Sequence, residues 1–222
     1  MSVSKTSTSE KASARSVLTT KNIAKIAILS AIATVLMLFE FPLPFAPSFY
    51  KFDFSEIAVL LGAFAMGPVA GALIEAVKIV LNLLFNGTIT MGVGELANFL
   101  MGAAFVMPAG LIYKHHKTKK TAVLGCVIGS ITSGAAAVVL NYFVLLPLYS
   151  GFMPIDQILA MYAEILPFIN TKFRACLWAF PGNVFQCALY SVVTMLIYKP
   201  LSPLLHRNME TKKQVSAQES TE

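Results

Sequence analysis

The chain has 222 residues, of which 56% are apolar and only 13% are charged, and its mean hydropathy is +0.70. Soluble domains carry roughly 25% charged residues, so this sequence has too little polar surface for a water-soluble fold. The net charge is +6, but the basic residues flank apolar stretches, as at the cytoplasmic ends of membrane helices, and do not indicate a nucleic-acid groove. We therefore predict an all-α integral membrane protein that contacts the lipid bilayer and no nucleic acid.

Polar segments stand at both ends of the chain. Residues 1–20 are rich in Ser, Thr and Lys and contain no apolar core, so they are typical of a disordered cytoplasmic tail and not of a signal peptide. A second polar segment covers residues 206–222. The expected organisation is a membrane domain at 21–205 between two disordered cytoplasmic tails.

Six apolar stretches lie between the tails, separated by prolines, glycines or basic residues. Three prolines between 42 and 47 predict a rigid loop at about 40–54, after which either Asp53 or Ser55 can cap the next helix. A short additional helix is expected around 157–165. The predicted spans cover about 22–39, 56–66, 69–85, 95–113, 121–146 and 175–198.

The positions of the basic residues predict the orientation. Thirteen of the 17 lie in the N-terminal region, in the polar break at 114–120 or after the last span. Only Lys51, Lys172 and Arg174 lie on the connections that would then face outward. Because basic residues favour the cytoplasmic side, this asymmetry predicts an even number of helices. We expect six transmembrane helices in the cell membrane, with both termini in the cytoplasm.

Amide side chains within the spans are candidate ligand-binding residues, because polar groups are costly to place in a bilayer. Asn141 lies in the fifth span, and Asn183 and Gln186 lie three residues apart in the sixth. An amide both donates and accepts hydrogen bonds without carrying charge, which suits a neutral heteroaromatic imide. Hydrogen bonding between helices is the alternative role.

Charged and polar residues on the third and fourth spans are further candidates. Glu75 and Lys78 are three residues apart, so they can pair on one helix face, or one of them can contact a ligand. Glu95 and Asn98 open the fourth span beside a glycine-rich connection. Glu95 can also serve only to stabilise the helix dipole.

Two further features concern the surface. Aromatic residues near the outward helix ends, Phe49 and Tyr50 among them, fit an interfacial belt, although a flat ligand could stack on one or two of them. Ala27 and Ala31 form a small-residue step on the first span. Such a step allows close helix packing, either within this subunit or against a partner.

The sequence contains no pattern typical of an enzyme. There is no phosphate-binding lysine loop, no metal-ligand spacing and no Ser-His-acid set, and Cys126, Cys176 and Cys187 form no paired motif. We therefore expect no catalysis, no metal and no cofactor. Any energy for transport would have to come from other subunits.

Several blocks of the sequence, in order, resemble the riboflavin-specific S components of energy-coupling-factor (ECF) transporters. The blocks are residues 41–56, 66–71, 75–78, 92–99 and 140–147. The resemblance implies a six-helix membrane subunit that binds riboflavin on its outer side. It also implies three partners: a transmembrane coupling protein and two ATP-hydrolysing subunits.

The same resemblance implies roles for particular residues. Asn141 and Asn183 match asparagines that hydrogen-bond the isoalloxazine ring, and the proline-rich loop would cap the vitamin. Ala27 and Ala31 match the face that contacts the coupling protein. In one departure, Gln186 stands where the family has a lysine near the flavin. Gln can still bond a carbonyl but supplies no charge, so Lys51 could instead meet the ribityl chain or a phosphate, which leaves FMN as an alternative ligand.

Together these features predict the substrate-binding subunit of an ECF-type importer, with riboflavin as transported ligand and not as cofactor. The predicted ligand-binding residues are Asn141, Asn183, Gln186, Lys51, Phe49, Tyr50, Glu95, Asn98 and Lys78. One alternative is a stand-alone facilitator or secondary carrier for a flavin or another vitamin, working without ATPase partners. Another is a structural membrane protein whose polar residues only join helices.

Overall fold

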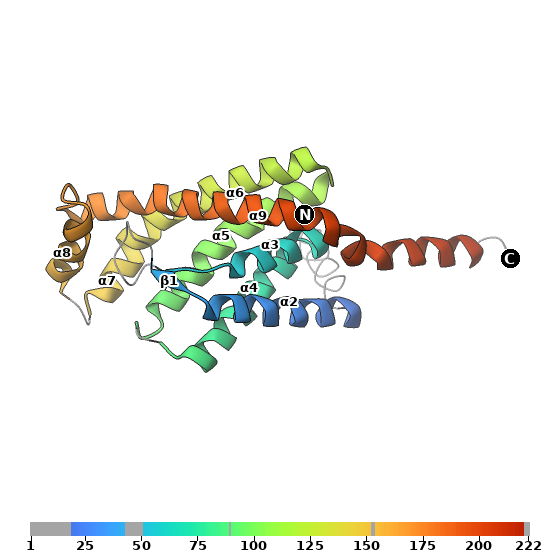
Figure 1. Cartoon of the computed structure of the whole chain (residues 1–222), viewed down its shortest axis with the longest axis horizontal. Coiled ribbons are helices and arrows are strands. Elements are labelled where there is room, and N and C mark those ends of the chain that lie inside the picture. Colours follow the sequence, from blue (N-terminus) through green and yellow to red (C-terminus); the bar gives the residue numbers. More distant parts are fainter. Residues whose placement is uncertain (1–18, 43–50, 89, 152–153, 220–222) are drawn as a thin grey trace, which may run out of the picture.

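The computed structural model describes residues 19–42, 51–88, 90–151 and 154–219, with side chains as far as residue 198. These residues form a helical bundle with one short antiparallel hairpin, in which Phe41 pairs with Phe52 (Figure 1). The elements in chain order are α2 (Thr20–Leu38), β1 (Phe41–Pro42), β2 (Lys51–Phe52), α3 (Ser55–Met66), α4 (Pro68–Asn86), α5 (Val93–His115), α6 (Lys119–Leu140), the π-helix η1 (Asn141–Leu145), α7 (Leu146–Tyr149), α8 (Ile155–Ile165) and α9 (Lys172–Glu219).

Five helical stretches are long and apolar enough to cross a bilayer. They are α2, α4, α5, the continuous stretch Lys119–Tyr149, and Lys172–Tyr198 within α9. Their outer faces expose large apolar side chains such as Ile28, Leu84 and Leu196. Apolar groups at such density on a surface fit lipid and not water, so the prediction of an all-α membrane protein is confirmed.

The second of the six predicted spans, α3, is an interior helix. Its 12 residues rise only about 18 Å, against the roughly 30 Å of a bilayer core. Most of its residues are buried, and Val59 and Leu60 have no exposed surface. α2, α4, α5 and α9 all pack against it. The predicted count of six therefore corresponds to five full-length helices and one short helix that they enclose.

A tight turn reverses the chain between α3 and α4. Gly67 has a φ of 102°, a left-handed conformation that favours glycine, and its N–H donates to the Ala63 carbonyl at 2.8 Å. Pro68 follows at the first position of α4, where its missing N–H costs no helical hydrogen bond. The separation of the predicted spans at 56–66 and 69–85 is confirmed.

The helices α5 and α6 lie in backbone contact. A Cβ atom added at Gly129 would stand 2.4 Å from the Phe105 carbonyl oxygen, and one at Gly125 would stand 2.8 Å from that of Ala109. Small residues four apart allow this approach between membrane helices. One turn further along α6, the Ser133 hydroxyl donates to the Met101 carbonyl at 3.0 Å. The close pairing thus fixes where the polar groups of α5 and α6 lie.

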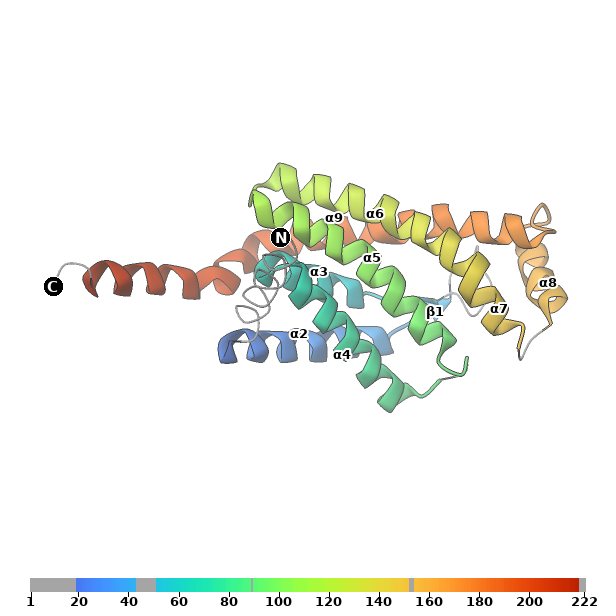
Figure 2. The same ribbon diagram turned by 180° about the vertical axis from the view of Figure 1, so that it is seen from behind.

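Three connections lie at one end of the bundle. The hairpin, the α4–α5 connection and the helices α7 and α8 gather at this end, while the α5–α6 connection with its lysines lies at the other (Figures 1 and 2). Helix α8 confirms the predicted short helix near 157–165, and Ile158 and Tyr162 anchor it against α7 and the first turns of α9.

The last helix extends beyond the bundle. The sequence places the end of the membrane domain at residue 205, whereas the backbone of α9 remains helical to Glu219 (Figure 1). Residues 209–219 are polar, but Met, Glu, Lys, Gln and Ala among them favour helices, so polarity alone does not end the helix. The predicted N-terminal tail lies almost entirely outside the described residues.

Candidate ligand-binding site

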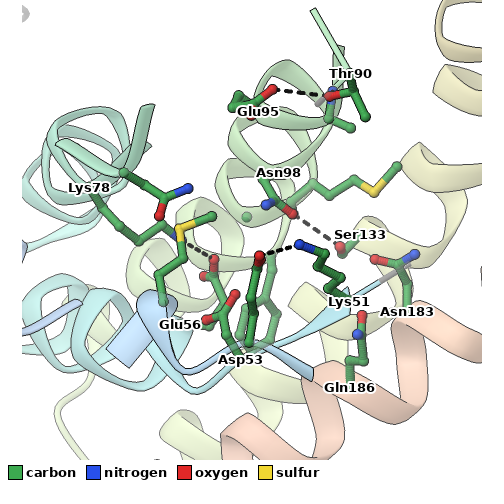
Figure 3. A pocket seen from close by; sticks show the side chains of 18 of the residues that line it. Lys51, Asp53, Glu56, Lys78, Thr90, Glu95, Asn98, Ser133, Asn183 and Gln186 are labelled. Carbon is green, nitrogen blue, oxygen red and sulfur yellow. Dashed lines mark hydrogen bonds and ion pairs between the residues drawn. The ribbon is translucent and has the colours of Figure 1, made fainter. Parts of the chain in front are cut away.

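A cavity of about 210 Å³ lies among the helices at the hairpin end of the bundle, large enough for a small organic molecule (Figure 3). Side chains from α2, the hairpin, α3, α4, α5, α6, η1, α7 and α9 form its wall. The wall contains both polar and apolar residues. Its polar residues are Glu40, Lys51, Asp53, Glu56, Lys78, Asn82, Asn86, Thr90, Glu95, Asn98, Ser133, Asn141, Asn183 and Gln186, and its larger apolar ones are Met37, Met101, Phe105, Leu145, Tyr149 and Tyr190.

The first polar side carries three amides. Asn183 and Gln186 lie one turn apart on α9 and are 5% and 8% exposed. The Nδ2 group of Asn183 donates to the Ala179 carbonyl at 3.1 Å, and that of Asn141 donates to Ala137 at 2.7 Å. Asn141 begins the π-helix, a distortion often found at functional sites because it turns side chains away from the regular helical positions. An amide side chain has two N–H donors and one carbonyl acceptor, so it can take part in more than one hydrogen bond.

The second polar side is charged, and lies across the cavity from Asn183 and Gln186 (Figure 3). The Lys78 ammonium lies 2.7 Å from Glu56 Oε1 and 2.8 Å from Glu75 Oε2, and the lysine side chain is 1% exposed. Two carboxylates therefore hold one ammonium at the cavity wall. Because both acids compete for Lys78, its charge is largely compensated before any ligand arrives.

A glycine makes room for this cluster. A Cβ atom at Gly102 on α5 would stand 2.7 Å from Glu75 Oε1 and 2.9 Å from Glu56 Oε1, which is closer than real Cβ contacts. The two carboxylates thus occupy the space that a side chain would take on α5. A side chain at position 102 would force one or both carboxylates to shift from their places beside Lys78.

The hairpin is tied to the helices around the cavity. Lys51 on β2 forms an ion pair with Glu40, which lies between α2 and β1, and the Asn86 amide donates to the same carboxylate at 3.5 Å. Phe52 stacks on Tyr190 of α9, with ring centroids 5.3 Å apart. The sequence predicts a rigid loop here, and in its described part the backbone forms a strand pair instead.

The first turn of α5 forms a hydrogen-bonded corner of the cavity. Glu95 Oε2 accepts from the hydroxyls of Thr88 at 3.0 Å and Thr90 at 3.3 Å. These hydroxyls in turn accept from the N–H groups of Gly92 and Gly94. Glu95 is therefore held in place through side chains, and the N–H groups of Gly92 and Gly94 already have acceptors.

The structure brings together most of the residues that the sequence singles out for the ligand. Seven of them line the cavity: Asn141, Asn183, Gln186, Lys51, Glu95, Asn98 and Lys78. Phe49 and Tyr50 lie outside the described residues. Ala27 and Ala31 are exposed on the outer face of α2, so they do not pack within the described part of this subunit. Whether these residues bind ligand or partner stays a prediction.

Sequence reasoning missed part of the charged side. Asp53 and Glu56 stand out in the sequence only as capping signals, and Asn82 and Asn86 are not singled out at all. The sequence does contain a pattern that indicates Asn82 and Asn86. With Glu75 and Lys78 they recur at spacings of three or four residues in an otherwise apolar helix. Such a polar stripe indicates one inward face of a membrane helix.

A partly open cavity with polar and apolar lining, set between the helices of an apolar bundle, fits a membrane protein that binds a small molecule. Residues 21–198 match the family described as ECF transporter, substrate-specific component, and the chain belongs to this family. The family predicted from the five sequence blocks is thereby confirmed.

Named relatives and a solved structure agree with this assignment. The chain is 38% identical over 189 residues to the riboflavin transporter RibU of Staphylococcus aureus (strain TCH60), covering 84% of this chain and 93% of that protein. It is 30% identical over 194 residues to the riboflavin transporter FmnP of Bacillus subtilis (strain 168), covering 84% and 95%. The solved structure, described as the S component of a bacterial ECF transporter, has a TM-score of 0.65 and 37% identity, covering 83% of this chain and 97% of that one.

Proposed function

We propose that this chain is the riboflavin-binding subunit of an ECF transporter. It captures the vitamin from outside the cell and passes it to a coupling protein driven by two ATP-hydrolysing subunits. The observation that carries the proposal is the cavity at the hairpin end, where three amides face a charged wall. The names of the relatives, all riboflavin transporters, supply the ligand.

The amide side suits the polar edge of the isoalloxazine ring. That edge presents carbonyl acceptors beside an imide N–H donor, and the amides of Asn141, Asn183 and Gln186 can serve both without burying a charge. Tyr190 and Leu145 also line the cavity and offer aromatic and aliphatic surface to a flat ring. Gln186 acts in this scheme as a neutral hydrogen-bonding partner of a ring carbonyl.

The positions of the lysines at the ends of the bundle support the proposed orientation. The lysine-rich connection at 114–120 lies opposite the hairpin end, so the positive-inside rule puts the cavity on the outer side and both termini in the cytoplasm. Ala27 and Ala31 then form a small-residue step on the outer face of α2, open to the coupling protein within the membrane.

Uptake of labelled riboflavin tests the proposal. Cells that lack their own riboflavin synthesis and uptake should accumulate the vitamin when they express this chain together with the coupling protein and the ATPases, and should not when the ATPases are inactivated. Uptake that persists without them would identify a stand-alone carrier instead. Absence of riboflavin uptake under both conditions would contradict the proposal.

Paired variants test the site. Asn183→Ala removes a buried amide from the cavity wall and is expected to weaken riboflavin binding at least about tenfold, the effect of leaving buried polar groups unpaired. Thr132→Ala is the matched control, because Thr132 is exposed on α6 and its hydroxyl bonds only its own helix, to the Ile128 carbonyl. Equal affinities of the two variants would place the ligand elsewhere.

A further inference from the structure

Two basic residues begin α9 at the hairpin end of the bundle. Lys172 and Arg174 stand in its first turn, where α9 packs against α7 and α8 (Figures 1 and 2). This turn contains no acidic residue. Positive charge at a helix start is unfavourable, because the helix dipole is positive there as well. The positive-inside rule also favours basic residues at the opposite end, where the lysine-rich connection lies. The chain therefore places two cations where both the helix dipole and the proposed orientation disfavour them.

No carboxylate pairs with either cation within the described part of the chain. The Lys172 ammonium lies over the ring of Tyr142, 4.9 Å from the ring centroid. Arg174 Nη1 donates to the Phe168 carbonyl and to Asn170 Oδ1, each at 3.0 Å. The ion pairs among the described residues all lie at the cavity, and the two acids of α8 are exposed and join none of them. The contacts of the two cations thus orient their side chains but do not neutralise their charge.

Exposed apolar side chains stand beside the two cations. Phe173 lies between them in the sequence and is 62% exposed. Phe168, whose carbonyl accepts from the guanidinium, is 54% exposed. Leu177, one turn beyond Phe173, and Phe143 on η1 add further exposed apolar surface. Cations bordered by exposed aromatic and aliphatic groups fit the level in a bilayer where headgroups meet acyl chains.

We propose that Lys172 and Arg174 bind the headgroup of an anionic phospholipid, whose acyl chains lie along the exposed face of α9 that begins with Phe173 and Leu177. Charge complementarity favours this occupant, because such a headgroup supplies the negative charge that the described residues do not. The exposed apolar side chains favour a lipid over a small soluble anion, which would gain nothing from contact with them. A bound lipid would hold the start of α9, and α8 packed against it, at the level of the headgroups. This surface lies outside the cavity, so the inference is independent of the proposed riboflavin binding.

Trp178 can report lipid binding at this position. It is the single tryptophan of the chain, it lies one turn beyond Arg174, and its ring packs against that of Phe168 with centroids 5.6 Å apart. Brominated acyl chains quench tryptophan fluorescence only at short range, so quenching of the purified full-length protein in bilayers measures which lipid stands beside Trp178. Phosphatidylglycerol, which is anionic, should be preferred over zwitterionic phosphatidylcholine at least about threefold at low ionic strength. Added salt should reduce this preference.

Two double variants separate a specific site from attraction to the overall charge. Lys172→Gln with Arg174→Gln should abolish the preference for phosphatidylglycerol. Lys117→Gln with Lys120→Gln removes the same charge from exposed positions at the opposite end and should leave the preference intact. A preference that survives the first double variant, or that falls equally in both, would overturn the inference.

Two measurements on the wild-type protein need no variant. Equal quenching by brominated phosphatidylglycerol and brominated phosphatidylcholine would identify an ordinary lipid contact and overturn the inference. Soluble glycerol phosphate carries the same anionic group without acyl chains, so it should not relieve the quenching by brominated phosphatidylglycerol. Relief of quenching by glycerol phosphate would identify a site for small anions and would also overturn the inference.

Discussion

Replacing Lys78 with methionine is expected to destabilise the protein strongly. The lysine is 1% exposed, and its ammonium lies 2.7 Å from Glu56 Oε1 and 2.8 Å from Glu75 Oε2. Methionine fills a similar volume but leaves two buried carboxylates without their cation. Removing one member of a buried ion pair costs about 3–5 kcal/mol. At about 2–4 °C per kcal/mol for a chain of this size, the melting temperature should fall by on the order of 10 °C.

Thermal unfolding of the purified variant in detergent, followed by intrinsic fluorescence, measures this loss. Lys119→Met removes an exposed lysine and should leave the melting temperature unchanged, so it controls for the loss of one positive charge. Adding Glu56→Gln and Glu75→Gln to Lys78→Met removes all three charges together and should recover most of the loss. A Lys78→Met protein that melts within about 2 °C of wild type would refute the reasoning.

Three further predictions concern close packing and coupling. Gly102→Ala pushes a methyl group against the Glu56 and Glu75 carboxylates and should weaken riboflavin binding, measured by titration. An unchanged affinity for riboflavin would show that these carboxylates do not shape the binding site. Gly129→Ala places a Cβ against the Phe105 carbonyl and should destabilise the folded protein by about 1–3 kcal/mol, measured by thermal unfolding. Gly182→Ala, with open space around its Cβ, should leave the melting temperature unchanged. Equal melting temperatures of the two variants would contradict the close packing of α5 and α6. Ala31→Trp should abolish ATP-dependent uptake but preserve riboflavin binding, and uptake at the wild-type rate would exclude α2 as the docking face.

The amide side of the cavity was predictable because it follows from local periodicity. Asn183 and Gln186 lie three residues apart in an apolar helix, so they must share a face, and a polar face in a membrane helix points inward. Asn141 could be singled out by the same argument. Its position relative to the cavity depends on the π-helix at Asn141–Leu145, which regular helical geometry does not contain.

The charged side was only partly predictable because it depends on contacts between helices. The sequence indicates that Glu75 and Lys78 can pair along one helix. It does not indicate that Glu56, 22 residues away, shares the same ammonium, since this requires the reversal at Gly67 and the packing of α3 against α4. Asp53 and Glu56 also fit a helix-capping motif, so the residue types around them do not indicate that they line a cavity.

The enclosed position of α3 was signalled in the sequence only by the short length of the predicted span at 56–66. Its apolar composition, with three Ala and two Leu, suits lipid contact and interior packing equally, because lipid tails and protein cores are both apolar. Length is the feature that separates the two. A helix of 12 residues cannot span the bilayer alone, and its burial among four neighbours follows from their packing.

Equilibrium titration of the purified wild-type protein with riboflavin tests the central claim most directly. One saturable site per chain, with a dissociation constant below about 1 µM, is the predicted result. Absence of saturable binding at micromolar riboflavin, in protein whose thermal melt shows it to be folded, would contradict the assignment of this cavity to the vitamin.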